Sequence, residues 1–239
     1  MQIRSHRGYP TPVGSFWDAY PEHPELYDRF ALSTLYAVPI AHELVEFRSA
    51  RVLDVASGTG KNAIEHAKIA RWVIGIEPMP KMRDYAIARA ASLGIANVEF
   101  RDGIAEDLSA FSDDTFDVVT SMHGAPFPWD TERRFLRESE RVVRKGGHIV
   151  IVGTTPGWRP QHLRGSDSDF GNTEVLRVMG ELERFGFVHR DVVVDMDYST
   201  PQEALETFGF IYGPQAIDYI LDHGASRLEW SLRIYTRTV

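Results

Sequence analysis

Between residues 51 and 153 the sequence alternates short β-branched runs with longer helical stretches. The expected strands cover residues 51–55, 72–77, 98–101, 116–121 and 148–152, and the expected helices cover 61–70, 80–93 and 130–144. Apolar strands that are separated by helices of this length pair in parallel through right-handed crossovers. The pattern therefore predicts an α/β fold, a Rossmann-like doubly wound sheet with helices on both faces.

Outside this central part the pattern changes. A helix is expected at 173–185, then a strand at 187–198, helical pieces at 201–210 and 214–222, and a last strand at 228–236. The two late strands raise the expected total to seven, and they predict a sheet that is mostly parallel with an antiparallel C-terminal strand. The first 49 residues show no strand pattern and several aromatic residues, which predicts an N-terminal helical cap, 1–49. Residues 50–239 then form one domain with substrate-binding insertions at 154–172 and 196–225.

Composition excludes several classes of chemistry. The chain has 26 basic and 34 acidic residues, a net charge of −8, which disfavours nucleic-acid substrates. The absence of cysteine excludes thiolate catalysis and Cys-ligated metals, and the nearest two of the nine histidines are 14 residues apart, so we expect no metal site. Because there is no apolar run of membrane-spanning length and no signal-peptide pattern, a cytoplasmic protein without membrane contact is expected.

The segment VLDVASGTGKNA, residues 52–63, joins a buried strand to a helix through two glycines. Gly58 and Gly60 allow a tight turn and let a ligand touch the main chain at the positive end of the helix. Glu77 ends the next strand, 17 residues after Gly60. A carboxylate at that place can accept both hydroxyl groups of a ribose, so the two features together predict a nucleoside-containing ligand.

Two cofactors fit such a ligand. The loop can be written Gly58-x-Gly60-x-x-Ala63, which a dinucleotide-binding domain tolerates, and an NAD-dependent oxidoreductase is the alternative that follows. Asp54 at the end of the loop's own strand favours the other choice. A carboxylate there is suited to the ammonium group of S-adenosyl-L-methionine and not to a pyrophosphate.

Five segments, taken in order, resemble a class I S-adenosylmethionine-dependent methyltransferase of the small-molecule group that includes quinone-biosynthesis methyltransferases. They are VLDVASGTG (52–60), IEPMPKM (76–82), RDGIAEDL (101–108), TFDVVTS (115–121) and ESERVVRKGG (138–147). Their order and spacing match that family, and the last two expected strands resemble its reversed sixth and seventh strands. The resemblance implies S-adenosyl-L-methionine as the cofactor.

The resemblance also implies a set of cofactor-binding residues: Asp54, Ala56, Ser57, Gly58 and Gly60 for the methionine part, Glu77 for the ribose, Pro78, Met79, Ile104 and Ala105 for the adenine, with Ser121, Met122 and Tyr27 completing the site. The family often has an acidic residue where this chain has Ile104. Backbone groups of Ile104 and Ala105, or the side chains of Asp102 or Glu106, are the expected replacements for that contact.

His123 follows the fourth strand, in SMHGAPFPWD, and is the candidate general base; the alternative is that it only lines the pocket or caps the strand. Phe127 and Trp129 in the same loop favour an apolar or aromatic acceptor, although Trp129 can equally attach the following helix to the core. Tyr20 and Tyr27 of the cap are candidates for a cation–π contact with the sulfonium, or for core packing.

The sequence thus predicts methyl transfer to an oxygen or nitrogen of a small-molecule acceptor, in specialised metabolite biosynthesis. Two alternatives stay open, the NAD-dependent oxidoreductase and a catalytically silent S-adenosylmethionine-binding subunit. The sequence leaves a homodimer open as well.

Overall fold

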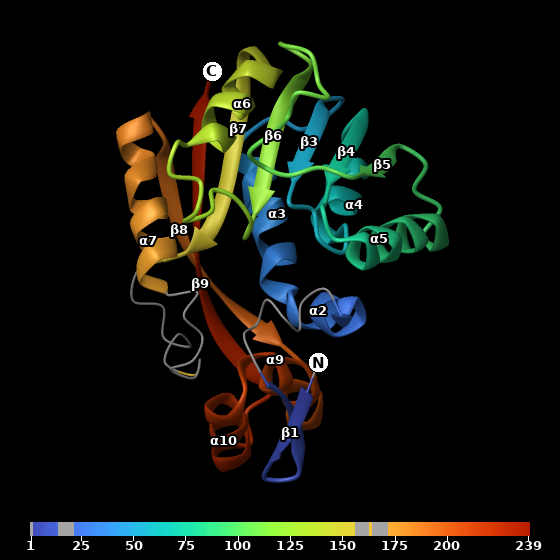
Figure 1. The fold of residues 1–239 in the computed structure, drawn as a ribbon, viewed down its shortest axis with the longest axis vertical. Helices are drawn as coiled ribbons and strands as arrows, with labels where there is room; N and C mark the ends of the chain where they lie inside the picture. Colours follow the sequence, from blue (N-terminus) through green and yellow to red (C-terminus); the bar gives the residue numbers. More distant parts are fainter. Residues whose placement is uncertain (1, 14–21, 156–162, 164–171) are drawn as a thin grey trace.

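A seven-stranded sheet forms the centre of the computed structural model, which describes residues 2–13, 22–155, 163 and 172–239 (Figure 1). Its strands, in spatial order, are β5 (Val98–Arg101), β4 (Trp72–Ile76), β3 (Arg51–Val55), β6 (Phe116–Met122), β7 (Val143–Thr154), β9 (Arg227–Thr238) and β8 (Val188–Asp197). The pairs from β5 to β7 are parallel, and β9 runs antiparallel to both of its neighbours. The predicted fold class is confirmed.

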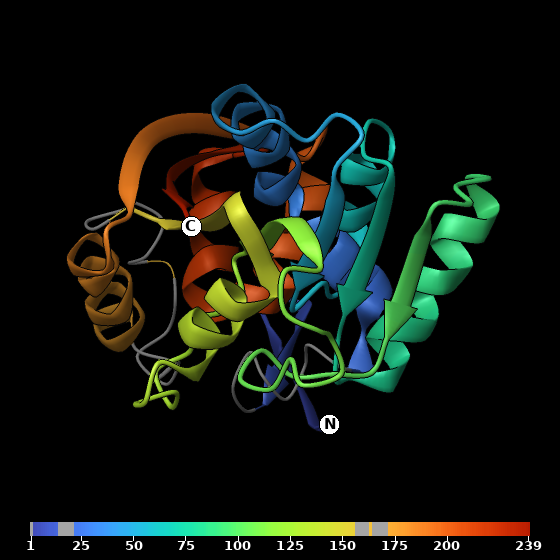
Figure 2. The same ribbon diagram turned by 90° about the horizontal axis from the view of Figure 1, so that it is seen from above.

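Helices cover both faces of this sheet (Figure 2). One face carries α3 (Leu32–Leu44), α4 (Lys61–Ala67) and α5 (Pro80–Ser92). The other face carries α6 (Arg134–Val142), α7 (Asn172–Glu181) and the 3₁₀ helix η3 (Leu182–Phe185). The sheet is therefore the middle layer of three.

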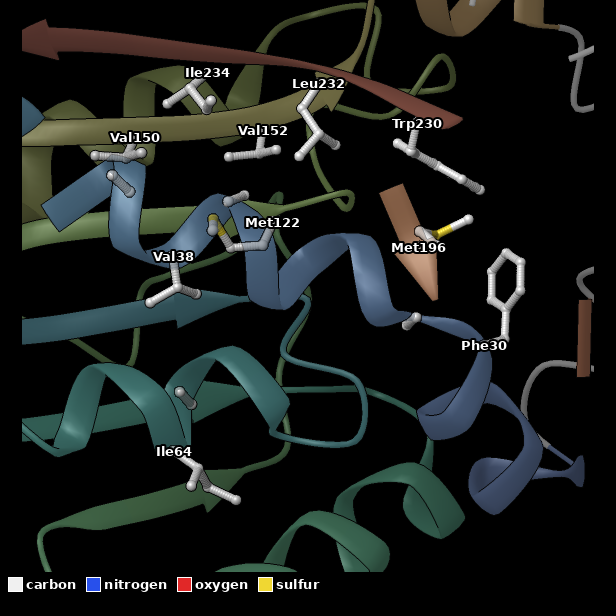
Figure 3. Close-up of a cluster of buried hydrophobic side chains, with 14 of the residues drawn as sticks. Phe30, Val38, Ile64, Met122, Val150, Val152, Met196, Trp230, Leu232 and Ile234 are labelled. Atoms are coloured by element: carbon white, nitrogen blue, oxygen red, sulfur yellow. The ribbon is translucent and has the colours of Figure 1, made fainter. Parts of the chain in front are cut away.

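Alternation along the strands divides the apolar side chains between two cores. On β3, Val52 belongs to the cluster on the α3–α5 face and Leu53 to the cluster on the α6–α7 face, and both are fully buried. Figure 3 shows the first cluster, in which Val150 and Val152 of β7 lie near Val38 of α3. Strands that are buried on both faces need apolar residues at successive positions, which explains the continuous β-branched runs in the sequence.

Beyond the sheet, β8 and β9 extend into a second group of elements, which we call the distal lobe. It contains α8 (Pro201–Ala204), the π-helical turn η4 (Leu205–Gly209), α9 (Phe210–Tyr212), α10 (Pro214–His223), and a hairpin of β1 (Gln2–His6) and β2 (Tyr9–Val13) (Figure 1). His6 Nε2 lies 2.8 Å from Asp218 Oδ1, and Arg7 donates to Asp222 Oδ1 over 2.8 Å, so the hairpin is attached to α10.

The expectation that the first 49 residues hold no strand is wrong, because residues 2–13 form this hairpin. Arg7 and Gly8 at its tip have φ angles of 49° and 88°, and two consecutive residues with positive φ match the right-handed twist of a two-residue hairpin turn. The cap does contain helices, α2 (Pro24–Phe30) and α3. Tyr20 and most of the insertion at 154–172 lie outside the described residues.

Two element boundaries differ from expectation by more than three residues. The helix expected at 130–144 begins at Arg134, because both carboxylate oxygens of Asp130 accept backbone N–H groups at its start, from Arg134 over 2.9 Å and from Phe135 over 3.0 Å. The strand expected at 148–152 already begins at Val143. In the part of the chain that the structure describes, no helix is both long and apolar enough to cross a membrane.

Candidate functional site

The turn between β3 and α4 is built by residues with positive φ angles. These are Ala56 at 57°, Gly58 at 55° and Gly60 at 73°. A Cβ atom on Gly60 would lie 2.5 Å from Phe100 Cζ and 2.8 Å from the Cβ of Ala86, so only glycine fits there. The Ser57 N–H donates to the Ile76 carbonyl over 2.9 Å. The turn is therefore fixed against the carboxyl end of β4, next to Glu77.

The Glu77 carboxylate joins two loops. Its Oε2 accepts the N–H of Gly58 over 2.9 Å, and its Oε1 accepts the N–H of Met79 over 3.0 Å; the residue is 2% exposed. A carboxylate has about four acceptor positions, so one group can hold backbone amides and ribose hydroxyls together. The structure places Glu77 directly beside the glycine turn, where the sequence analysis puts the ribose.

The Asp54 carboxylate is buried, and its two oxygens differ in their hydrogen bonding. Thr120 Oγ1 donates to Asp54 Oδ1 over 2.7 Å, whereas Oδ2 has no hydrogen-bond partner among the described residues. Burial raises the pKa of Asp54 to about 7 and the charge of Glu77 raises it further, against the lowering effects of hydrogen bonding to Thr120 and to the backbone of Ala63. A nearby cation would satisfy Oδ2 and restore the charge, so the site fits the ammonium group of a methionine-type ligand.

The expected adenine wall lies at the same edge of the sheet. Ile76 of β4 pairs with Arg101 of β5, and three residues after each of them stand Met79 and Ile104, which are 40% and 49% exposed. Pro78 is exposed as well, whereas Ala105 is buried. Two accessible apolar side chains on neighbouring loops suit the two sides of a flat ring.

Asp102 and Glu106, the acids expected to replace the missing adenine contact, already form hydrogen bonds with other side chains. Arg83 donates to Asp102 over 3.0 Å, and Glu106 accepts the indole N–H of Trp129 over 2.7 Å. Trp129 also stacks on Phe127 with a centroid separation of 4.5 Å. Trp129 therefore links the loop after β6 to residues 101–108, the expected adenine loop.

The end of β6 packs directly on the glycine turn. A Cβ atom on Gly124 would lie 2.7 Å from Ala56 Cβ and 3.0 Å from Ser121 Oγ. Ser121 is fully buried, and its hydroxyl finds no hydrogen-bond partner within the described ranges. Met122 is 5% exposed and belongs to the hydrophobic cluster of Figure 3, so its thioether packs in the core.

His123 adopts a left-handed conformation, with φ at 62°, and its N–H donates to the Val152 carbonyl over 2.9 Å. Its ring lies edge-on to Trp230 with centroids 6.4 Å apart. Nε2 is buried and has no hydrogen-bond partner in the described part of the chain. Burial lowers the pKa of His123 to about 4, so the imidazole is neutral at pH 7 and can accept a proton on one ring nitrogen, as a weaker base than an exposed histidine.

The cap helix α2 also reaches this edge. Tyr27 lies close enough to Glu77 and Asp28 for both carboxylates to raise the pKa of its phenol, in addition to the larger effect of burial. Asp28 accepts a hydrogen bond from Thr59 Oγ1 over 2.9 Å. The sequence analysis missed Asp28 and Thr59, since nothing in the local pattern connects residues that are 31 positions apart.

Beside His123 lies a group of aromatic side chains around Phe30. The centroid of Phe30 is 5.5 Å from Tyr212, 5.8 Å from Phe208 and 6.0 Å from Trp230. These residues come from α2, the distal lobe and β9. Among the described residues, no three His, Asp or Glu side chains are grouped so as to hold a metal ion.

In comparisons with known proteins, the chain matches methyltransferases. Residues 52–147 match the family model of a methyltransferase domain. The chain is 34% identical over 102 residues to the uncharacterized methyltransferase YcgJ of Bacillus subtilis, which is 43% of this chain and 40% of that protein. It is 36% identical over 106 residues to the demethylmenaquinone methyltransferase of Chlorobaculum parvum, 44% and 41% of the two chains. The alignments thus span about two fifths of each of these relatives.

Solved structures show the same fold over more of the chain. The crystal structure of YcgJ superimposes with a TM-score of 0.58 and 19% identity, covering 84% of this chain and 96% of that one. A SAM-dependent methyltransferase from Aquifex aeolicus superimposes with a TM-score of 0.56 and 19% identity, covering 92% and 98%. The part matched by sequence carries the glycine turn, Glu77 and the adenine loop.

Proposed function

Because residues 52–147 are a class I S-adenosylmethionine-dependent methyltransferase domain, related to YcgJ and demethylmenaquinone methyltransferase, we propose that this protein methylates an oxygen or nitrogen of a small molecule. The proposed setting is specialised metabolite biosynthesis. One observation carries the proposal, the unpartnered Oδ2 of buried Asp54 beside the glycine turn, which suits a cationic ligand.

The same observation disfavours the NAD-dependent alternative. A pyrophosphate at the glycine turn would bring its negative charges next to two buried carboxylates, Asp54 and Glu77. Lys61 is the basic residue at the start of α4, and its ammonium is already paired with Asp28. Like charges in a poorly solvated site repel strongly, so a ligand with an ammonium and a sulfonium is the better electrostatic match.

The proposed roles follow from position. Asp54 accepts the ammonium group, Glu77 accepts the ribose hydroxyls, and Met79 and Ile104 flank the adenine. When bound, S-adenosylmethionine supplies an electrophilic methyl group on a sulfonium. The remaining work of the protein is to align the acceptor atom and remove a proton where the acceptor is a hydroxyl, and alignment alone contributes about 7–11 kcal/mol in favourable cases.

His123 is the proposed base. Its neutral imidazole stands at the end of β6, next to the strand that carries Asp54. A nitrogen that is buried and unpartnered is available to accept the proton of a bound hydroxyl, a step worth about 10²–10⁴ in rate. Trp230 and the aromatic residues beside it support an apolar or aromatic acceptor.

Titration calorimetry with S-adenosylhomocysteine and, separately, NAD⁺ tests the cofactor. Binding of NAD⁺ without binding of S-adenosylhomocysteine would contradict the proposal. A screen of phenols, hydroquinones and amines, with formation of S-adenosylhomocysteine as the readout, then tests the acceptor class. Cofactor binding without turnover across the screen would favour the silent cofactor-binding subunit.

A further inference from the structure

Asp28 on the cap helix α2 is bound by side chains from the glycine turn and from α5. Its Oδ1 accepts the Thr59 hydroxyl over 2.9 Å and pairs with the guanidinium of Arg89 on α5. Lys61 Nζ lies 3.7 Å from the same oxygen and also donates to the backbone carbonyl of Asp28. The Asp28 side chain is 14% exposed, and charge-assisted bonds at such a site are stronger than exposed ion pairs.

The partners of Asp28 belong to the glycine turn itself. Thr59 stands between Gly58 and Gly60, and Lys61 is the first residue of α4. Lys61 is 5% exposed, and burial lowers its pKa to about 8, while the charge of Asp28 opposes this shift. Asp28 therefore stabilises a buried ammonium at the start of α4 and attaches the cap to the same turn.

Three further observations place α2 at the edge of the sheet that carries the glycine turn and Glu77. In Figure 1, α2 lies beyond the carboxyl end of β3 and beside α5. Glu22, just before α2, accepts the Lys81 ammonium of α5 over 2.9 Å. Tyr27, adjacent to Asp28, lies within the electrostatic reach of Glu77. The cap helix thus faces both the glycine turn and the carboxylate proposed to bind the ribose.

The other end of α2 is anchored in the aromatic group. Tyr198 Oη donates to the Phe30 carbonyl over 3.2 Å, and the Phe30 ring packs against Tyr212 and Trp230. A helix of seven residues is too short to be stable alone. Its position therefore depends on tertiary contacts, among them the aromatic group at Phe30 and the ion-pair group at Asp28.

We propose that Asp28 is a positioning residue that latches α2 over the glycine turn, so that a bound S-adenosyl ligand dissociates only after the latch opens. The inference rests on the proposed function, because it assumes that this edge binds S-adenosylmethionine. It adds a residue that need not touch the ligand and that controls how long the ligand stays.

The variant Asp28→Asn keeps the size of the side chain and removes its charge. We expect S-adenosylhomocysteine to bind about tenfold more weakly, mainly through a faster dissociation rate constant, as measured by calorimetry and stopped-flow fluorescence. Glu25→Gln is the matched control, because it removes one charge from the same helix at a side chain that is 57% exposed. Its affinity and dissociation rate should equal those of the wild type.

Two further measurements separate a latch from general destabilisation. Thr59→Val removes one donor to Asp28 and should also accelerate dissociation, by a smaller factor. In the ligand-free protein, hydrogen exchange of residues 24–30 should accelerate in Asp28→Asn while exchange in α10 stays unchanged. Unchanged dissociation in both variants would overturn the latch, and so would faster exchange throughout the molecule. A wild-type protein that does not bind S-adenosylhomocysteine would instead overturn the proposed function.

Discussion

The substitution Glu77→Gln tests the ribose site most directly. Each oxygen of the Glu77 carboxylate accepts one backbone N–H, from Gly58 over 2.9 Å and from Met79 over 3.0 Å. A glutamine has only one acceptor oxygen, so its NH₂ group must face one of these two N–H groups. At a residue that is 2% exposed, one buried donor then loses its partner, which costs about 1–3 kcal/mol of folding stability.

The effect on ligand binding is separate and can be measured separately. Loss of hydrogen bonds from a charged acceptor to the ribose hydroxyls should weaken S-adenosylhomocysteine binding by about 1.5–3 kcal/mol, or roughly 10–150-fold. Calorimetry gives the affinity, and urea denaturation gives the unfolding free energy. Glu99→Gln on β5 is the control, because that exposed carboxylate pairs with Arg101 and not with the turn.

The 2′,3′-dideoxy analogue of S-adenosylhomocysteine makes the test specific. If Glu77 binds the ribose, the substitution should cost little affinity for the analogue, since the hydroxyl groups that it would lose are already missing. Equal losses for both ligands would show that Glu77 acts only by bracing the glycine turn. Wild-type affinity for both ligands would remove Glu77 from the site altogether.

Three other predictions concern His123, Gly60 and His66. His123→Ala should lower kcat about 10²–10⁴-fold with unchanged cofactor affinity, and unchanged turnover at saturating acceptor would show that the imidazole is not the base. Gly60→Ala should cost clearly more unfolding free energy than Gly94→Ala, because both have positive φ but only at Gly60 would the new methyl meet Phe100; equal costs would contradict this crowding. Burial lowers the pKa of His66 to about 3 from 6.5, so its stabilising contribution is complete above pH 6.5 and declines as the pH falls toward 3. Between pH 7.5 and pH 5, His66→Gln should therefore lose about 2 kcal/mol less stability than the wild type in denaturant titrations, and equal losses would refute the assignment.

The sequence was sufficient for the central sheet because its signals are local. Residues 52–55 are buried on both faces, so Val52 and Leu53 are apolar in succession before Asp54, and the glycine turn follows at once. Position 60 requires glycine because its φ angle is positive and because a Cβ atom there would clash with Phe100. The glycine that meets both requirements can be read directly in the sequence. The positions of Glu77 and His123 follow from where their strands end. Their roles remain predictions that the experiments above address.

The N-terminal hairpin escaped prediction for a physical reason. Its second strand, YPTPV, carries Pro10 and Pro12, which normally argue against a strand. In a two-stranded ribbon, alternate amides point away from the partner, and Pro10 and Pro12 share one such alternate set, opposite Ser5 and Ile3. Prolines are tolerated there, so the composition that suggests a loop is compatible with an edge strand.

The contacts of Asp28 were inaccessible for another reason, because they depend on tertiary structure alone. Asp28 is 31 residues from Thr59 and 61 from Arg89, and no periodicity relates these positions. The same holds for Trp129, whose indole binds Glu106 across 23 residues. Contacts between side chains of different elements depend on how the elements pack in the folded protein. A single sequence therefore predicts the helices and strands but not the side-chain contacts between them.

This difference also explains why the cofactor is easier to assign than the acceptor. The family match covers residues 52–147, which contain the glycine turn, Glu77 and the adenine loop. The aromatic group beside His123 takes Phe30 from α2, Phe208 and Tyr212 from the distal lobe and Trp230 from β9, all outside the matched segment. The residues proposed to hold the methyl donor therefore lie in the segment that this chain shares with its relatives. The residues proposed to bind the acceptor come from the two ends of this chain, so the acceptor screen must use the whole chain.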